Sequence, residues 1–311
     1  GSTGAASVAD ISQGQLGDCE LLACLIEQVI NHPSQLASMI VNDGNGVYGV
    51  RFYVNGSEVW VTVNNALPTY NGSLVYNNAY ASSSTLWADL VEKAYAQLSA
   101  TGQIGHPAIN SYQNISADAA DNVLTNLTNC SSVTYYDSAS SGWNSYRQLI
   151  IDDIANHYDV ILETGPKSAT IYDAAGKIEL IADHAYAVIG YDGATGNFIV
   201  RNPWGTVSSS QIYDTQFEVS MAMIASVQGD FAVDNSINSI ATVIVRAATA
   251  HEIVRNSSTP LAGLFTITNS TGASITEYGF QLAGSGAIQL NGATNLATAA
   301  PRSRSSKISQ R

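Results

Sequence analysis

A continuous apolar stretch from Leu21 to Ile26 is the clearest pattern near the start of the chain. It begins just after Cys19 and ends near Pro33, a length and composition that predict a buried helix. Asp18 lies where a helix N-cap residue is expected. The pattern therefore predicts that Cys19 lies in the first turn of a helix, where the backbone dipole favours negative charge.

The remaining pattern divides the chain into a helix-rich part followed by a strand-rich part. In the first part, an alternating hairpin turned at Asn55-Gly56 precedes a helix over residues 85–98. Residues 131–142 are rich in Ser and Asp and are expected to form a crossover. A helix over 143–157 and a strand over 160–163 are predicted next.

These elements predict an α+β fold in a chain of 311 residues, of which 45% are hydrophobic. We expect a helix-rich half-domain over 1–130 and a β-rich half-domain over 131–248, closed by a strand over 241–246. Residues 249–300 alternate apolar and polar and are expected to form a small β appendage. Two interpretations of it stay open: a packing extension of the main domain, or a targeting or binding module.

The first part of the chain contains a candidate nucleophile. A neutral thiol is a poor nucleophile, so we expect the helix start and a nearby imidazolium to lower the pKa of Cys19. Gln13, six residues earlier, could donate its side-chain amide to a developing oxyanion, as could the backbone N–H of Cys19. Cys24 and Cys130 are expected to be small buried residues, and Cys19 is expected to stay unpaired.

A candidate base and its partner flank a second predicted hairpin. His184 begins an alternating strand, a turn follows, and the return strand ends at Asn202. Folding this hairpin about Ala194 brings the imidazole beside the Asn202 side-chain oxygen, which would fix the tautomer and orientation of the ring. Trp204 would cover the pair and exclude water. Structural or surface roles are expected for the remaining histidines, His32, His106, His157 and His251.

In this order, Gln, Cys, His and Asn, the motifs resemble those of the calpain family of papain-like cysteine proteases. Gln13 to Cys19 carries the family's QGxLGDC signature, and Leu86 to Ala96 resembles its FWSALLEKAYAK helix. The segments from His184 to Tyr186 and from Arg201 to Gly205 match its last two catalytic motifs. The resemblance extends over roughly residues 10–205 and implies a papain-like two-lobed core with the active site between the lobes.

The implied activity is endopeptidase hydrolysis through a thioester. The resemblance assigns the nucleophile to Cys19, the base to His184, the orienting role to Asn202 and the oxyanion donor to Gln13, with Asp18 and Trp204 in support.

Two positions depart from the family pattern: Glu20 replaces the usual Trp, and Asp183 replaces the usual Gly. A carboxylate beside the sulfur would oppose the thiolate if it pointed inward, but we expect Glu20 to face elsewhere on the helix. These departures keep open a catalytically silent binding protein on the same fold. A transglutaminase-like transferase is a further alternative, although such enzymes usually pair His with Asp, not Asn.

Calcium is a separate expectation from the resemblance, because calpain cores bind it in acidic loops. Asp10 matches one acidic position, but the second falls near the uncharged Gln103. Hard cations prefer anionic oxygens, so a calcium site is expected to be weakened. The thiol chemistry requires no cofactor, and calcium dependence stays open.

The net charge of −13 is unevenly distributed, because residues 1–301 carry 25 acidic and only 8 basic residues. Such an acidic body argues against nucleic acid as a partner, and no apolar run reaches the length of a membrane span. The expected partner is a protein or peptide substrate. Few charges among many Ser, Thr, Asn and Gly residues indicate an extracytoplasmic or secreted bacterial protein, with the cytoplasm as the alternative.

The tail, residues 301–311, is basic and is expected to be disordered. Because its charge is opposite to that of the body, we hypothesise that it binds the acidic cleft as an inhibitor or self-cleavage site. The intact mass of the wild type should then decrease on incubation while that of Cys19→Ala stays constant. Full-length chains in both, with wild-type activity unchanged by tail deletion, would refute the hypothesis.

Overall fold

The computed structural model describes residues 6–77, 85–166 and 168–234, together with the backbone of four later strands. The chain forms two compact units, residues 1–238 and 239–311. This boundary precedes the predicted one at residue 248. The strand predicted over 241–246 is β14, Val243–Ala247, and it belongs to the second unit, where it pairs with β15, Phe265–Asn269.

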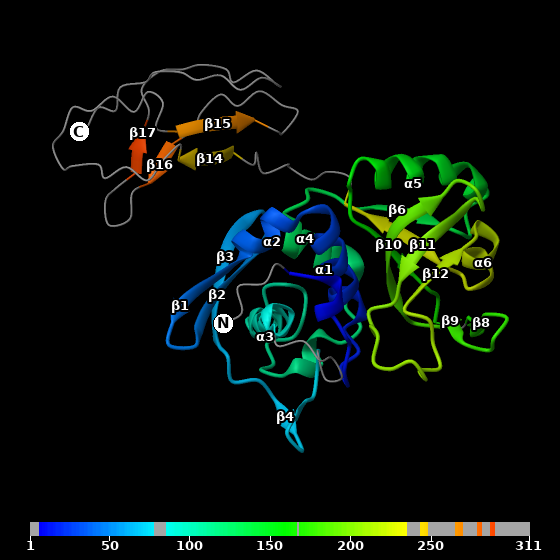
Figure 1. Ribbon diagram of the computed structural model, residues 1–311, viewed down its shortest axis with the longest axis horizontal. Helices are drawn as coiled ribbons and strands as arrows, with labels where there is room; N and C mark the ends of the chain where they lie inside the picture. The colour runs from blue at the N-terminus through cyan, green and yellow to red at the C-terminus, as the bar shows by residue number, and fades with distance from the viewer. Residues whose placement is uncertain are drawn as a thin grey trace. The chain divides into compact units, whose positions relative to one another are not determined.

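The first part of unit one is rich in helices and contains a small antiparallel sheet (Figure 1). Its helices are α1 Cys19–Asn31, α2 Pro33–Met39, α3 Trp87–Ser99 and α4 Ala120–Thr128, with 3₁₀ turns at Val8–Asp10 and Tyr112–Ile115. Its strands are β1 Ile40–Gly44, β2 Val47–Val54, β3 Ser57–Asn64, β4 Thr69–Tyr70 and β5 Ser73–Leu74. The predicted hairpin β2–β3 and both predicted helices are confirmed, whereas α2, α4, β1, β4 and β5 were not predicted.

The second part is built on one six-stranded antiparallel sheet of order β12-β11-β10-β7-β13-β6. The strands are β6 Thr134–Asp137, β7 Val160–Glu163, β10 Ala185–Asp192, β11 Asn197–Arg201, β12 Gln216–Val219 and β13 Asp230–Val233. The remaining elements are the 3₁₀ turn Trp143–Ser145, α5 Tyr146–Ala155, β8 Ile171–Tyr172, β9 Ile178–Leu180 and α6 Met221–Ser226.

One prediction for this part was wrong. The segment 131–142, expected to be a crossover, contributes the strand β6 to the edge of the sheet. Its Ser- and Asp-rich flanks concealed a strand of four residues that, among the described strands, pairs with β13 alone.

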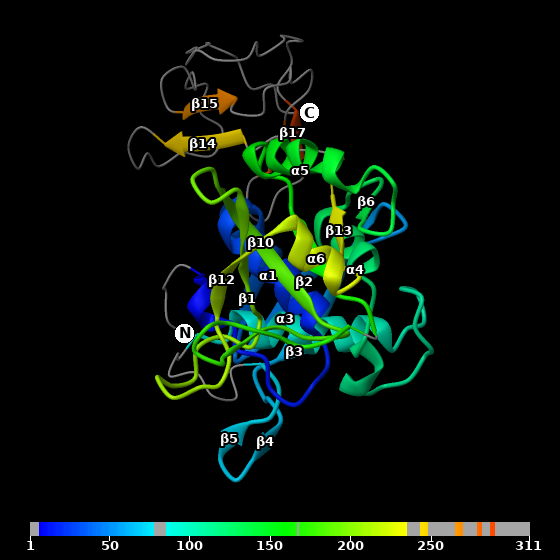
Figure 2. The same cartoon turned by 90° about the vertical axis from the view of Figure 1, so that its right-hand side faces the viewer.

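Helix α1 lies against the sheet and joins the two parts of the unit (Figure 1, Figure 2). Strand residues alternate between faces, and the face toward α1 carries small side chains at Ala185, Ala187 and Ala232. The opposite face carries a second core of larger residues, including Tyr186 and Phe231. The alanines allow the helix, which is buried from Cys19 to Gln28, to approach the sheet closely.

A second connection between the two parts runs along the backbone near residue 205. The Gln13 backbone N–H donates to the Pro203 carbonyl at 2.9 Å, and the Ser12 hydroxyl donates to the Trp204 carbonyl at 3.2 Å. Gly205 has a φ of +68°, and a Cβ on it would lie 2.5 Å from the Ile11 carbonyl oxygen. Only glycine fits this position without displacing backbone.

Replacing Gly205 by Ala should therefore destabilise the protein by about 2 kcal/mol or more, because left-handed strain and overpacking add. Urea unfolding measures the change. Gly193→Ala is the matched control, since nothing lies within 4 Å of its added Cβ, and it should change the free energy of unfolding by less than about 0.5 kcal/mol. Equal stability of the two variants would contradict the description of this connection.

The second unit contains two two-stranded sheets, β14–β15 and β16–β17, with β16 at Gly279–Gln281 and β17 at Ala287–Gln289. The predicted appendage falls partly on these strands, and the basic tail lies outside the described residues. Within the parts of the chain that the structure describes, no helix is long and apolar enough to cross a membrane.

Candidate active site

Cys19 is the first residue of α1 and lies where this helix meets β10. The side chain is buried, and the backbone N–H of Ala185 faces its sulfur, an interaction that favours the thiolate. The packing of α1 on the sheet thus places the thiol next to the residue that follows His184. The predicted position of Cys19 at the start of a buried helix is confirmed.

His184 and Asn202 meet as the hairpin pattern predicted. The hairpin is β10–β11, and the His184 Nε2 lies 2.9 Å from the Asn202 Oδ1. Asn202 is fully buried, and the same Oδ1 accepts a hydrogen bond from the Trp204 backbone N–H at 3.0 Å. Because Nε2 is held by the amide oxygen, Nδ1 is left as the ring atom that can exchange a proton with a thiol.

The backbone at His184 is fixed by β7 and by an unusual turn. The His184 N–H donates to the Thr164 hydroxyl at 3.1 Å, and the Thr164 N–H donates to the His184 carbonyl at 3.0 Å. Asp183 has a φ of +49°, in the left-handed region where glycine costs least. This conformation explains physically why glycine suits the position before the histidine, and Asp183 adopts it nonetheless.

Aromatic rings surround the imidazole. The Trp204 ring lies 5.0 Å from the His184 ring, centroid to centroid, and Tyr186 makes an edge contact at 4.7 Å. Tyr213 makes an edge contact with Trp204, with the ring centroids 5.0 Å apart. Burial lowers the pKa of His184 to about 4 despite the hydrogen bond to Asn202, which favours the charged form. The imidazole is therefore neutral at pH 7 in this structure.

Gln13, the predicted oxyanion donor, is engaged elsewhere in this structure. Its Nε2 donates to the Leu16 carbonyl at 2.8 Å and to the Asp18 carboxyl at 3.4 Å. The second bond is long, so it is the one that a substrate oxygen would most readily replace. The amide thus lies in the loop before Cys19, without an N–H left free for an oxyanion.

Asp18 lies at the N-cap position of α1, but its side chain does not cap the helix. It forms a buried pair with Glu92 of α3, and burial raises the pKa of both carboxyls. Glu92 also accepts hydrogen bonds from the Asn77 backbone N–H at 3.2 Å. Sequence reasoning missed this carboxyl pair, although each residue lies in a motif that carries the family resemblance.

The predicted electrostatics of Cys19 were wrong. The thiol pKa is raised, first by burial and then by the nearby charge of Glu20, instead of being lowered by the helix and an imidazolium. The Glu20 side chain, expected to face elsewhere, accepts a hydrogen bond from the Cys19 sulfur at 3.4 Å. Among the described residues, no hydrogen bond joins the sulfur to His184.

The residues considered for calcium do not gather into a site. The Asp10 carboxylate accepts hydrogen bonds from the Ser7 N–H at 2.9 Å and from the Trp87 indole at 2.8 Å. Gln103 is exposed beyond the end of α3. Over the described residues, no three His, Cys, Asp or Glu side chains form a metal-binding group. Among the described residues, the candidate donors therefore form no cluster that would hold a calcium ion.

The site consists of a buried thiol at the start of a helix and a histidine that contacts an asparagine amide across a strand pair. In a protein of mixed α and β structure, this arrangement defines the cysteine-protease class. Residues 2–217 match the family model described as calpain family cysteine protease. The chain therefore belongs to the calpain family of cysteine proteases.

Several animal proteins are similar to this chain. Human Calpain-9 is 29% identical over 216 residues, and the Calpain-2 catalytic subunit of Gallus gallus is 30% identical over 217. Calpain clp-1 of Caenorhabditis elegans is 26% identical over 209 residues. The matches cover 66%, 66% and 63% of this chain, but only 29%, 29% and 25% of those proteins. The chain thus corresponds to less than a third of their length.

The buried carboxyls predict an unusual pH dependence of stability. Burial raises the pKa of Glu20 to about 7 and that of Glu163 to about 8. Because the pKa of each group is higher in the folded than in the unfolded protein, the folded protein binds more protons between the two pKa values. The free energy of unfolding therefore decreases as the pH rises from the unfolded to the folded pKa. His184 acts in the opposite sense, but only below its unfolded pKa of about 6.5.

We therefore expect the thermal unfolding midpoint to fall between about pH 6.5 and about pH 8. Differential scanning calorimetry at constant ionic strength measures this change. Glu163→Gln removes one of the titrating groups and should make the fall shallower. A midpoint that is constant or rises over this range would contradict the assigned protonation of the buried carboxyls.

Proposed function

We propose that the chain is a cysteine endopeptidase that hydrolyses peptide bonds through a thioester acyl-enzyme. The observation that carries the proposal is the 2.9 Å contact between His184 Nε2 and Asn202 Oδ1. The next residue, Ala185, presents its backbone N–H to the Cys19 sulfur. Membership of the calpain family supports the same reaction class.

The proposed reaction has two stages. The Cys19 thiol gives its proton to Nδ1 of His184, and the sulfur attacks the substrate carbonyl carbon. The backbone N–H of Cys19 and the Gln13 amide donate to the oxyanion. The imidazolium then protonates the departing amine and leaves a thioester. Water, deprotonated by His184, hydrolyses the thioester and restores the thiol.

A catalytically silent binding protein is the second candidate, and one observation favours it. The Cys19 thiol donates a hydrogen bond to Glu20, and its pKa is raised. Both features oppose formation of the thiolate. Labelling with a peptidyl fluoromethylketone separates the two candidates, because only a nucleophile assisted by His184 reacts with this group rapidly. If His184→Ala labels at the wild-type rate, the binding protein is the better description.

The partner of the proposed enzyme is a protein or peptide. The possibility that its own C-terminal tail is one such substrate stays a hypothesis, as does the extracytoplasmic location predicted from composition. Calcium regulation is compatible with family membership, and testing cleavage with and without EGTA would establish whether it applies to this chain.

Substitutions at the three central residues should differ in severity. Cys19→Ala and His184→Ala should each lower kcat/KM for a cleaved peptide by about a thousandfold or more, because each removes a reacting group. Asn202→Ala only releases the orientation of the base, so a smaller loss, roughly ten- to a hundredfold, is expected. A peptide library first identifies the substrate, and steady-state kinetics give the ranking.

Cys130→Ala is the matched control, since this thiol is buried near the end of α4, where it contacts Thr125, and should leave kcat/KM unchanged. A loss in Asn202→Ala greater than that in His184→Ala would contradict the assigned roles.

A further inference from the structure

The nucleophile of the proposed enzyme has an acidic partner that the reaction does not require. The Cys19 sulfur donates a hydrogen bond to Glu20 Oε2 at 3.4 Å, and Glu20 as a residue is only 9% exposed. In this structure the thiol of Cys19 therefore donates its hydrogen bond to the Glu20 carboxyl. The proposed reaction requires it to give this proton to His184 instead.

The start of α1 explains why Glu20 turns back toward the sulfur. The first N–H groups of a helix have no partner within it, and they attract acceptors and negative charge. The backbone N–H of Glu20 lies near the Glu20 carboxyl and stabilises its charged form. With its carboxyl near its own N–H, Glu20 also reaches the side chain of the preceding residue, Cys19.

The titratable groups that face Glu20 come from three elements and are acidic. Asp18 precedes it at the start of α1, Asp118 lies just before α4, and Glu163 ends β7. The Cys19 thiol completes the set. Burial and these negative neighbours raise the pKa of Glu20 to about 7. The carboxyl therefore changes charge near neutral pH instead of staying ionised.

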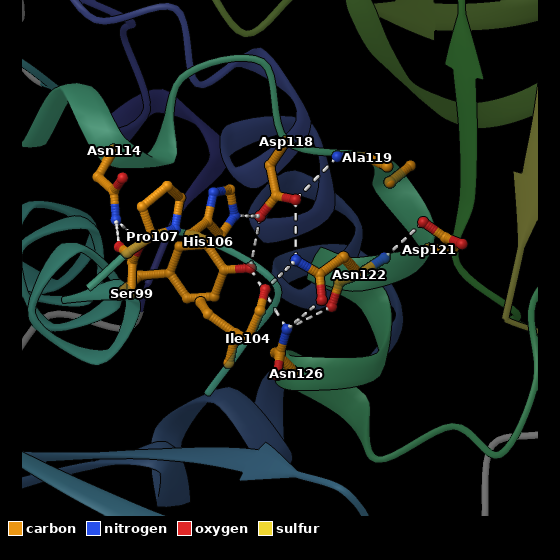
Figure 3. Close-up of polar contacts among 12 residues, drawn as sticks. Ser99, Ile104, His106, Pro107, Asn114, Asp118, Ala119, Asp121, Asn122 and Asn126 are labelled. Atoms are coloured by element: carbon orange, nitrogen blue, oxygen red, sulfur yellow. Dashed lines mark hydrogen bonds and ion pairs between the residues drawn. The ribbon is translucent and has the colours of Figure 1, made fainter. Parts of the chain in front are cut away.

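Asp118 is held at this position by a polar network (Figure 3). Its carboxylate accepts hydrogen bonds from the Tyr95 hydroxyl at 2.7 Å and from the Asn122 amide at 2.8 Å, and it lies 3.0 Å from His106 Nε2. His106, expected to be structural, thus pairs with Asp118, and among the described residues Glu20 forms no ion pair.

Proton exchange between the two side chains follows from their chemistry. A thiol donates to a carboxylate, and a protonated carboxyl can donate to a thiolate. A thiolate beside a carboxylate places two like charges in contact in a buried site, the least favourable state. Removing the second proton from the pair therefore costs more than removing one from an isolated thiol.

We propose that Glu20 is a positioning residue that ties the ionisation of Cys19 to its own, so that the carboxylate form suppresses the thiolate and the protonated form permits it. This inference rests on the proposed function, in which the thiolate is the attacking species. It predicts an enzyme whose nucleophile is suppressed above neutral pH, where an ordinary thiol would become more reactive.

Alkylation of Cys19 by iodoacetamide tests the proposal without any need for proteolysis. Rates are measured on the full chain at several pH values, with the Cys19 peptide quantified by mass spectrometry. Glu20→Gln keeps the size of the side chain and removes its charge. At about pH 8.5 it should react at least about tenfold faster than the wild type, the effect of lowering the thiol pKa by one unit or more. At about pH 5.5 the two rates should agree within about threefold.

Glu27→Gln is the matched control, because it removes a buried acid of the same helix that is not hydrogen-bonded to the sulfur, and its rate should stay within about threefold of the wild type at every pH. Glu20→Ala, should the glutamine variant fail to fold, is expected to show the same rise above neutral pH. Thermal unfolding verifies that each variant is folded.

Two results would overturn the proposal. Slower alkylation of Glu20→Gln at every pH would make Glu20 the base that activates the thiol. A ratio to the wild type that does not change with pH would make its contact with the sulfur incidental. Neither result depends on peptide cleavage, so failure of this inference and failure of the proposed protease function are distinguishable.

Discussion

The contact between α1 and the alanine-lined face of the six-stranded sheet determines the rest of the candidate site. Small side chains at Ala185, Ala187 and Ala232 let an apolar helix approach β10 closely. The same contact brings the first residue of the helix, Cys19, to the first residue of the strand, next to His184. Two segments separated by more than 160 residues thus meet because of packing, and the chemistry depends on that packing.

Much of this arrangement could be predicted from the sequence, because the patterns involved are local and strong. The apolar run after Cys19 predicted the helix, and the alternation on both sides of the turn at residues 193–196 predicted the hairpin that joins His184 to Asn202. The edge strand β6 was missed because four residues in a polar segment carry too little alternation to detect. Its place in the sheet is set by pairing with β13, which is distant in sequence.

The electrostatics of the site could not be predicted in the same way. Whether Glu20 faces solvent or sulfur depends on how deeply the first turn of α1 is buried, and that burial comes from distant segments. The same holds for Asp18, which pairs with Glu92 of α3 instead of capping its own helix. Protonation follows burial and neighbours, so the raised thiol pKa appears only once the fold is known. The outcome is a family member whose candidate thiol and imidazole lie on neighbouring segments and are neutral in this structure.

The central claim is that the Cys19 sulfur and the His184 imidazole lie within reach of one another at the junction of α1 and β10. Treatment with 1,3-dibromoacetone tests it directly, because this reagent alkylates a thiol and then bridges it to a neighbouring nucleophile. The account predicts a proteolytic fragment in which Cys19 is bridged to His184, absent in His184→Ala. Modification of Cys19 that never reaches His184, or a bridge to another residue, would contradict it.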